Sequence, residues 1–302
     1  MDNLLITGSN GFIGRNLTEY FKTQYKIFTP HHNNWNLLNE KKLLSYVIKK
    51  RIDYIIHCAN LGGERNAEFE NVLGINLRMF FNIIKAKKYV KKIIYFGSGA
   101  EYNKMFPIQS VSENDFGVNI PTDDYGFYKY VCAKFIEQNI KTDIICLRLF
   151  GIYGRYENYR LRFISNAIVK NLFHFPIDMK QNVFFDYLYI DDLCRIVEFV
   201  LKNQTKFNIY NTASGKRTSL LAIAKMINNI SNFKSAIFVE KAGYNNEYTA
   251  SNVRLVSELP KFIFTTIGEG VEKLFEWYKN NLSNINRDEI YNQSAQLINR
   301  KL

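Results

Sequence analysis

The chain has 302 residues, of which 47% are hydrophobic and 23% are charged, so it can fill the core of one large domain or of two modest ones. This composition excludes a disordered chain. The formal net charge of +12 favours acidic partners, a class that includes nucleic acid, anionic membranes and phosphorylated small molecules. Lysine and arginine occur in short scattered groups without a long basic arm, which disfavours a nucleic-acid partner.

The start of the chain, its apolar runs, its histidines and its cysteines together favour a cytoplasmic protein that has no metal ion. We expect a strand at the very start of the chain, with no signal-type apolar core before it and no apolar run of membrane-spanning length. The four histidines lack the spacing of metal ligands. The four cysteines lie in apolar runs without a Cys-x-x-Cys pair and are expected to be buried thiols in a reducing compartment: Cys58, Cys132, Cys146 and Cys194.

In the first half of the chain, apolar runs of strand length alternate with longer amphipathic stretches. The runs are continuously apolar, which is typical of a sheet that is covered on both faces. The pattern therefore predicts an α/β protein with a Rossmann-type, doubly wound parallel sheet. Strands are expected at 4–7, 26–29, 54–58, 93–96 and 144–149, and helices at about 13–23, 40–50, 67–88 and 123–140.

The alternation loosens beyond about residue 150. We expect residues 1–150 to form the first domain, and residues 151–302 to form mainly a smaller, mixed α/β domain that carries substrate specificity. Segments between about 184 and 212 are expected to return to the first domain, because they contain two strand-like runs and a helix-like stretch. The polar stretch at about 282–302 could either pack or fray.

A glycine-rich turn follows the first predicted strand and leads into the first helix. In Gly8-x-x-Gly11-x-x-Gly14, the first glycine permits the tight turn, the second lets the backbone approach a pyrophosphate, and the third lets helix and strand pack closely. The helix N-terminus then offers unpaired N–H groups to the phosphates. The turn predicts that the first domain binds a dinucleotide, the alternative being a turn without a ligand; its contact residues are expected to be Gly8, Asn10, Gly11, Phe12, Ile13, Gly14 and Arg15.

The second predicted strand bears on which dinucleotide binds. It ends in Thr29-Pro30-His31-His32, without the acidic residue that would bind the ribose 2′-hydroxyl of NAD. Arg15 and His31 could instead hold a 2′-phosphate, although the histidines could equally lie in a solvated loop. We therefore expect NADP(H), with NAD(H) as the alternative.

Tyr125 and Lys129 are four residues apart within a predicted helix. Residues at this spacing share one helix face, so a phenol and an ammonium can meet the same bound ligand. The spacing shows only that they can meet, and an ordinary surface pair is the alternative.

Further motifs accompany the glycine turn and Tyr125-x-x-x-Lys129 along nearly the whole chain: 53–59, Asn76 in 74–77, 96–102, 148–154, 185–192, and Glu269-Gly270-Val271 with Trp277-Tyr278. In this order they resemble the extended branch of the short-chain dehydrogenase/reductase superfamily, the NAD-dependent epimerase/dehydratase family, which modifies nucleotide sugars. The resemblance implies a homodimer that pairs through the helices near 67–88 and 123–140.

The resemblance also implies roles for individual residues. Tyr125 would donate a proton to a carbonyl as hydride arrives from the nicotinamide. Lys129, one helical turn away, would favour the negative charge that develops on the phenol and would bind the nicotinamide ribose. Ser98 would hydrogen-bond the reacting oxygen, and Gly99 would contact the substrate. Ala59 and Asn76 would belong to the cofactor pocket.

The residues after Ser98 bear on the type of reaction. Dehydratases of this branch resemble one another in an Asp-Glu pair there, whereas this chain has Gly99-Ala100 and no evident acid or base to expel water. The loop at 59–63 looks like that of GDP-fucose synthase, whose epimerising cysteine is replaced by Ala100. We therefore expect reduction of a keto group on a nucleotide-diphosphate-linked sugar. An NAD-dependent 4-epimerase is the alternative, and a dinucleotide-sensing or nucleic-acid-binding regulator is the non-enzyme alternative.

The expected grip on the substrate diphosphate departs from the family pattern. Related epimerases have an arginine before the position of Asp186, where this chain has Phe185. Guanidinium groups suit bidentate phosphate recognition. Arg155 and Arg217 are the substrate-binding candidates, with Arg160, Arg162 and Arg254 as further candidates, and solvated surface arginines are the alternative for each.

Overall fold

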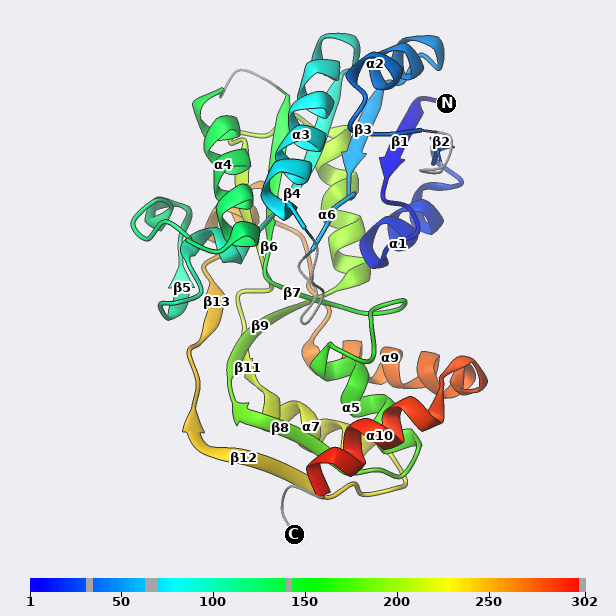
Figure 1. Ribbon diagram of the computed structural model, residues 1–302, viewed down its shortest axis with the longest axis vertical. Helices are drawn as coiled ribbons and strands as arrows, with labels where there is room; N and C mark the ends of the chain where they lie inside the picture. Colours follow the sequence, from blue (N-terminus) through cyan, green and yellow to red (C-terminus); the bar gives the residue numbers. More distant parts are fainter. Residues whose placement is uncertain (31–34, 63–69, 140–142, 299–302) are drawn as a thin grey trace.

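The computed structural model describes residues 1–30, 35–62, 70–139 and 143–298, with side chains to Asn292. Its main sheet has six parallel strands in the order β10-β6-β4-β3-β1-β2. This order confirms the predicted doubly wound parallel fold, which occupies the upper part of Figure 1. The strands are β1 (Asn3–Thr7), β2 (Lys26–Phe28), β3 (Tyr54–His57), β4 (Lys92–Ser98), β6 (Ile144–Leu149) and β10 (Ile209–Thr212).

Helices cover both faces of the main sheet, as continuously apolar strands require. Within β1, the side chains of Leu4 and Ile6 join the core under one helix layer and Leu5 joins the core under the other, all at most 1% exposed. One layer contains α1 (Phe12–Phe21) and α6 (Ile190–Lys202), and the other contains α2 (Glu40–Lys49), α3 (Val72–Lys85) and α4 (Asp124–Gln138). The helix predicted at 67–88 begins later, at Val72; residues 67–69 lie outside the described part, and a 3-10 turn, η1 (Ala86–Tyr89), follows it.

The second part of the molecule is a mixed α/β layer, drawn in the lower part of Figure 1. Its larger sheet has the order β11-β9-β13-β5, with β7 paired to β9, and β8 pairs with β12. These strands are β5 (Ile108–Val111), β7 (Gly151–Tyr153), β8 (Ile177–Asn182), β9 (Phe184–Tyr189), β11 (Arg217–Ser219), β12 (Ile237–Tyr244) and β13 (Tyr248–Ala250). The helices are α5 (Phe163–Leu172), α7 (Leu220–Ile230), α8 (Val253–Glu258), α9 (Ile267–Asn280) and α10 (Arg287–Ile298), with the short 3-10 turn η4 (Leu282–Asn284). Two other 3-10 turns, η2 (Gly99–Tyr102) and η3 (Glu113–Asp115), follow β4 and β5 in the chain.

The chain crosses between the two parts more than once. Helix α6 and strand β10 belong to the main sheet and its cover. Strand β9, also in the segment 184–212, lies in the second sheet, where it pairs with β11 and β13. In the opposite direction, β5 from the first half pairs with β13. The domain boundary at 150 stays a prediction.

The carboxy-terminal helix α10 packs against the second part. Its Ile290 is fully buried, and the ring centroids of Tyr291 and Phe175 lie 5.9 Å apart. The stretch that the sequence left open thus contains a docked helix. Within the described ranges, no helix has the length and apolarity that crossing a membrane requires.

A buried carboxyl group lies where α5 meets α9. Glu157 is 7% exposed, and Ser165 on α5 donates a hydrogen bond of 2.6 Å to its Oε2. The hydroxyl of Tyr278 on α9 donates to the Glu157 carbonyl at 3.4 Å. Burial raises the pKa of Glu157 from 4.5 to about 7, against the opposing effects of Ser165 and the charge of Arg162. The fold therefore favours the protonated acid.

We predict that Glu157 makes the protein less stable as the pH rises from about 4.5 to about 7. The folded state holds this proton longer than the unfolded state, so the free energy of unfolding falls across that window, by on the order of 3 kcal/mol from this group. Urea unfolding of Glu157→Gln from pH 4.5 to pH 8 should show a correspondingly shallower decline. Glu276→Gln, at a side chain 52% exposed, is the control and should keep the wild-type profile. Identical profiles for wild type and Glu157→Gln would contradict the prediction.

Candidate functional site

The glycine turn between β1 and α1 is folded too tightly to admit side chains. Gly8 has φ +66°, and a Cβ there would lie 2.7 Å from the backbone N of Ala59. A Cβ on Gly14 would lie 2.2 Å from the carbonyl oxygen of Gly8, so helix and turn could not pack as they do. The N–H of Gly11 donates to the same carbonyl at 3.0 Å, which closes the turn. The turn thus has the form that close backbone approach to a pyrophosphate requires.

The start of α1 suits an anion. Gly11 is its N-cap, and in the described part of the chain no side chain caps the helix and no acidic residue lies in its first turn. The first N–H groups, from Phe12, Ile13 and Gly14, therefore point out of the helix without a side-chain acceptor, at the positive end of the helix dipole. Asn10 immediately precedes the cap. This donor set fits the pyrophosphate of a dinucleotide.

The two side chains expected near an adenosine 2′-phosphate differ in how far the structure describes them. Arg15 lies on the first turn of α1, with its guanidinium carbon 3.6 Å from the centroid of the Tyr156 ring and its Nε 3.5 Å from Glu19. These contacts hold its head group against Tyr156 and against Glu19, which lies one turn further along α1. His31 lies outside the described residues.

A polar cluster that the sequence reasoning missed joins the ends of β1 and β3. Thr7 and His57 are register partners, and Thr7 Oγ1 lies 2.8 Å from His57 Nδ1. The N–H of Ala59 donates to the same Thr7 oxygen at 3.1 Å, so this hydroxyl contacts both the histidine ring and the backbone of Ala59. Burial, aided by the charge of Lys129, lowers the pKa of His57 to about 3, which keeps the ring neutral. The cluster fixes Ala59 beside Gly8.

Asn76, on α3, holds the loop that follows Ala59. Its side chain accepts a hydrogen bond from the N–H of Leu61 at 2.9 Å and donates to the carbonyl of Leu61 at 2.8 Å. It also donates to the carbonyl of Val72 at 2.8 Å, and it is 3% exposed. These bonds support the cofactor side of the sheet through the loop backbone.

Ser98 and the Tyr125/Lys129 pair meet at the carboxyl end of β4. Lys129 is 6% exposed, its Nζ donates to the carbonyl of Phe96 in β4 at 2.6 Å, and it lies 6.0 Å from the centroid of the Tyr125 ring. Ser98, the last residue of β4, is 8% exposed. The structure therefore brings the three predicted catalytic residues to one strand end.

The start of α4 packs closely against the loop that follows Ser98. Asp123 caps the helix by accepting a 2.7 Å hydrogen bond from the N–H of Gly126. A Cβ on Gly126 would lie 3.1 Å from the carbonyl oxygen of Ala100, so glycine there allows the helix to approach the Ser98 loop. The half-buried Tyr125 ring also has the Nζ of Lys104 5.1 Å from its centroid. Two ammonium groups thus lie near the phenol.

A buried ion pair between Glu101 and Arg148 holds the backbone at Ser98. Glu101 Oε1 accepts a 2.8 Å hydrogen bond from the N–H of Ser98, and Glu101 Oε2 lies 2.5 Å from Nε of Arg148 on β6. Both side chains are at most 1% exposed. Burial raises the pKa of Glu101, and Arg148 opposes that rise by stabilising the carboxylate. Arg148 Nη1 donates to the hydroxyl of Tyr102 at 2.8 Å and to Oδ1 of Asn211 on β10 at 3.1 Å.

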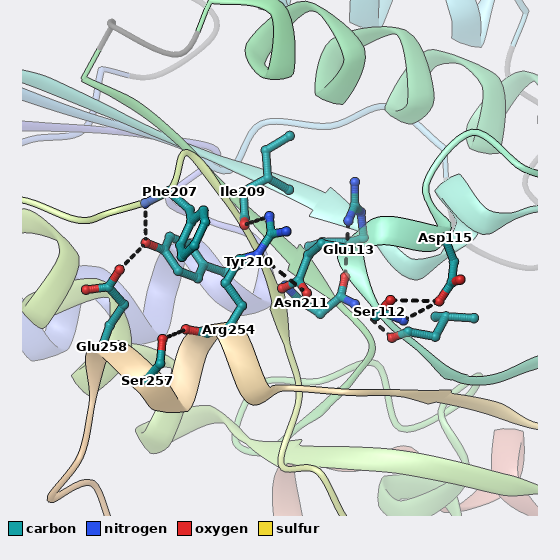
Figure 2. A network of polar contacts seen from close by, with 12 residues as sticks. Ser112, Glu113, Asp115, Phe207, Ile209, Tyr210, Asn211, Arg254, Ser257 and Glu258 are labelled. Atoms are coloured by element: carbon teal, nitrogen blue, oxygen red, sulfur yellow. Dashed lines mark hydrogen bonds and ion pairs between the residues drawn. The ribbon is translucent and has the colours of Figure 1, made fainter.

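The network continues from Asn211 toward the second part of the molecule. Glu113 Oε1 accepts a 2.7 Å hydrogen bond from the N–H of Asn211, and Glu113 Oε2 lies 3.8 Å from Nε of Arg254 on α8. Figure 2 shows this continuation, with Arg254 also donating to the carbonyl of Ile209 at 3.3 Å. Arg254, a further phosphate candidate in the sequence, thus ties α8 to β10.

The two principal substrate-binding candidates lie in different surroundings. Arg155 pairs with Asp191 on α6 at 3.3 Å, and its carbonyl accepts a 2.9 Å hydrogen bond from Asn16 on α1. Arg217 lies on β11, 58% exposed, and pairs with Glu247 at 3.2 Å. The structure does not bring the two arginines together among the described residues.

Two further substrate-binding candidates, Arg162 and Gly99, are both related to Tyr248. Arg162 immediately precedes α5, is exposed, and its charge acts on Tyr248 of β13. Gly99 lies under the same tyrosine, because a Cβ on Gly99 would be 2.5 Å from the Tyr248 hydroxyl. No cluster of three or more potential metal ligands occurs within the described ranges, and the expectation of a metal-free enzyme stays a prediction.

Comparison with known proteins identifies the family. The sequence model of the NAD dependent epimerase/dehydratase family matches residues 4–213, which is more than half of the chain. The protein belongs to this family. The predicted resemblance to this family is confirmed.

The relatives of this epimerase/dehydratase family member include several nucleotide-sugar enzymes. GDP-L-colitose synthase of Yersinia pseudotuberculosis is 24% identical over 79% of this chain and 85% of its own. A GDP-L-fucose synthetase from Naegleria fowleri bound to NADP has a similar structure, with TM-score 0.78 and 19% identity over 93% of this chain and 94% of its own. The dTDP-glucose 4,6-dehydratase of Bacillus anthracis in complex with NAD has TM-score 0.77 and 17% identity over 93% and 97%. The names of these similar proteins cover more than one reaction, and NADP and NAD each occur in one of the two similar structures.

We predict that Arg148→Ala destabilises the protein by about 3–5 kcal/mol, because it leaves the Glu101 carboxylate buried without its partner. Lys85→Ala is the control: it breaks an ion pair with Glu40 whose side chains are 53% and 43% exposed, and it should cost at most about 1 kcal/mol. Urea unfolding at neutral pH measures both. Equal losses for the two variants would contradict a supporting role for the buried pair.

Proposed function

We propose that the protein is an NADP(H)-dependent reductase of a keto group on a nucleotide-diphosphate-linked sugar. The observation that carries the proposal is the convergence of Ser98, Tyr125 and Lys129 at the end of β4, with Lys129 bonded to the β4 backbone. The glycine turn that fits a dinucleotide lies on β1, and only β3 separates β1 from β4 in the sheet. A cofactor held at one place can therefore reach an oxygen held at the other.

The residues of the glycine turn, with Ala59, Asn76 and Lys129, would hold the cofactor, which supplies a hydride when it is bound. Ser98 would donate a hydrogen bond to the substrate oxygen, and Tyr125 would transfer its proton to that oxygen. Lys129 would stabilise the charge that remains on the phenol. Its bond to the Phe96 carbonyl holds the ammonium in place, so little reorganisation accompanies the step.

Reduction is favoured over dehydration because of the residues next to Ser98. Gly99 and Ala100 provide no carboxyl group, and the nearest one, Glu101, is fully buried and paired with Arg148. A buried, paired carboxylate cannot reach a substrate to remove or supply a proton at carbon. The groups that remain, Ser98 and Tyr125, suffice for proton transfer to a carbonyl oxygen.

The diphosphate would bind on the second part of the molecule. Arg217 on β11 and Arg162 before α5 are exposed, and a guanidinium suits bidentate contact with phosphate. The charge of Arg162 already acts on Tyr248, close to Ser98. Arg155 is a weaker candidate because its contacts hold it against α1 and α6. The protein would act as a homodimer in the cytoplasm.

We predict that wild-type protein oxidises NADPH when a nucleotide-linked keto-sugar is added, and that Tyr125→Phe lowers kcat by about 10²–10⁴-fold because the proton donor is lost. The measurement is nicotinamide absorbance across a panel of keto-sugars on different bases. Tyr130→Phe, on the same helix and packed against Phe116, is the matched control and should keep wild-type turnover. Wild-type activity in Tyr125→Phe would contradict the proposal, and tightly retained nicotinamide with turnover that needs none added would favour the 4-epimerase.

We predict tighter binding of NADPH than of NADH, and that Arg15→Ala weakens NADPH binding about tenfold or more while leaving NADH binding nearly unchanged. A charged hydrogen bond to the 2′-phosphate has this magnitude. Calorimetric titration of both cofactors measures the preference. Lys22→Ala, which removes the same charge just past the other end of α1, is the control. An equal loss of affinity for NADPH and NADH would show that Arg15 does not bind the 2′-phosphate.

A further inference from the structure

A second phenol lies at the proposed catalytic centre. Tyr248, the first residue of β13, hydrogen-bonds through its hydroxyl to the side chain of Ser98. The same hydroxyl would lie 2.5 Å from a Cβ built on Gly99, so it stands directly over the residue after the catalytic serine. The charge of Tyr125 also acts on Tyr248. The Tyr248 hydroxyl therefore lies beside Ser98 and Gly99, at the strand end where Tyr125 and Lys129 are expected to act.

The Tyr248 ring is held in place by its strand and by two other rings. In the second sheet, Tyr248 is the register partner of Phe185 on β9 and of Ile108 on β5. Its ring centroid lies 5.3 Å from that of Phe150 and 5.8 Å from that of Phe185. We call Phe150, Phe185 and Tyr248 the aromatic wall. The wall is half-buried, so its rings keep some surface available for contact.

The aromatic wall has the chemical groups that suit contact with a sugar ring. Aromatic rings contact the C–H face of a sugar ring well, and a tyrosine adds a polar group at the edge of that contact. Phe185 stands where related epimerases have an arginine, so the wall replaces a charge with apolar surface beside Ser98. Burial raises the pKa of Tyr248, which keeps its hydroxyl protonated and able to donate a hydrogen bond.

We propose that Tyr248 orients the substrate: its hydroxyl donates a hydrogen bond to the sugar at or beside the reacting carbonyl, and the aromatic wall packs against the C–H face of the sugar ring. In the free protein the hydroxyl bonds to Ser98, and the substrate oxygen takes over this contact on binding. The inference rests on the proposed function, since it names how that same site holds its substrate. It assigns Tyr248 no proton transfer, which remains with Tyr125.

If this proposal holds, removing the Tyr248 hydroxyl and removing the Tyr248 ring have different effects on turnover and on substrate binding. Loss of the hydroxyl alone leaves the stacking surface intact, so substrate binds but its carbonyl is less well aligned with Ser98 and Tyr125. Loss of the ring removes the packing surface as well. A role confined to the fold would instead lower thermal stability and affect turnover only through the amount of folded protein.

The test compares Tyr248→Phe, Tyr248→Leu and wild type in steady-state turnover with the keto-sugar that wild type reduces. We expect Tyr248→Phe to lower kcat about 10- to 100-fold with little change in KM, and Tyr248→Leu to raise KM as well. The dissociation constant for NADPH and the unfolding temperature of Tyr248→Phe should match wild type. Tyr244→Phe, whose side chain is 61% exposed near the end of the preceding strand β12, is the matched control and should behave as wild type.

The outcomes separate this inference from the proposed function. Turnover by wild type with an unchanged kcat in Tyr248→Phe overturns the inference and leaves the function standing. A loss of kcat that is accompanied by an equal loss of folded protein or of NADPH binding also overturns it. Absence of turnover by wild type with every keto-sugar overturns the proposed function, and the inference falls with it.

Discussion

The hydrogen bond from Lys129 to the Phe96 carbonyl joins the two elements on which the candidate site depends. It attaches α4 to β4 just before Ser98, at 2.6 Å and with the Lys129 side chain buried. A buried ammonium costs much free energy unless its donors are satisfied, so the lysine is held firmly where the backbone accepts its proton. Tyr125, one turn earlier on the same helix, is placed by the same attachment.

A second constraint is the ladder of polar residues inside the main sheet. Arg148 is the register partner of Gly97 on one side and of Asn211 on the other, so its side chain projects from the same face of the sheet as that of Asn211. From there it meets Glu101, whose carboxylate also holds the N–H of Ser98. Through Asn211 and Glu113 the ladder reaches Arg254 and the second part of the molecule (Figure 2). The loop that follows Ser98 and the second part of the molecule are therefore positioned by one connected set of hydrogen bonds and ion pairs.

The sequence predicted those features whose signal is local. The glycine turn, the i, i+4 pair of Tyr125 and Lys129, and the continuously apolar strands each lie within a few residues, and the parallel sheet follows from them. The Thr7–His57 contact could have been found from the ends of two neighbouring parallel strands, since those ends share one sheet edge. The meeting of Tyr248 with Ser98 could not, because it depends on β13 pairing with β9 and β5. Nor does the sequence show that Asp191 and Asn16 hold Arg155 against α1 and α6.

The exchange of charge for aromatic surface beside Ser98 has a physical consequence for selectivity. An arginine before Asp186 would attract phosphate from a distance and tolerate varied sugars, because a charge contact is weakly dependent on the shape of what lies beyond it. Under the proposed function, Phe185 and Tyr248 would act only at contact, so they would discriminate by the fit of a C–H face and by one hydroxyl. The carboxylate of Asp186 itself remains occupied, accepting from the Ser214 hydroxyl and from the N–H groups of Ser214 and Gly215. Under the proposed function, diphosphate affinity would then come from arginines further out, and recognition of the sugar from the rings next to Ser98.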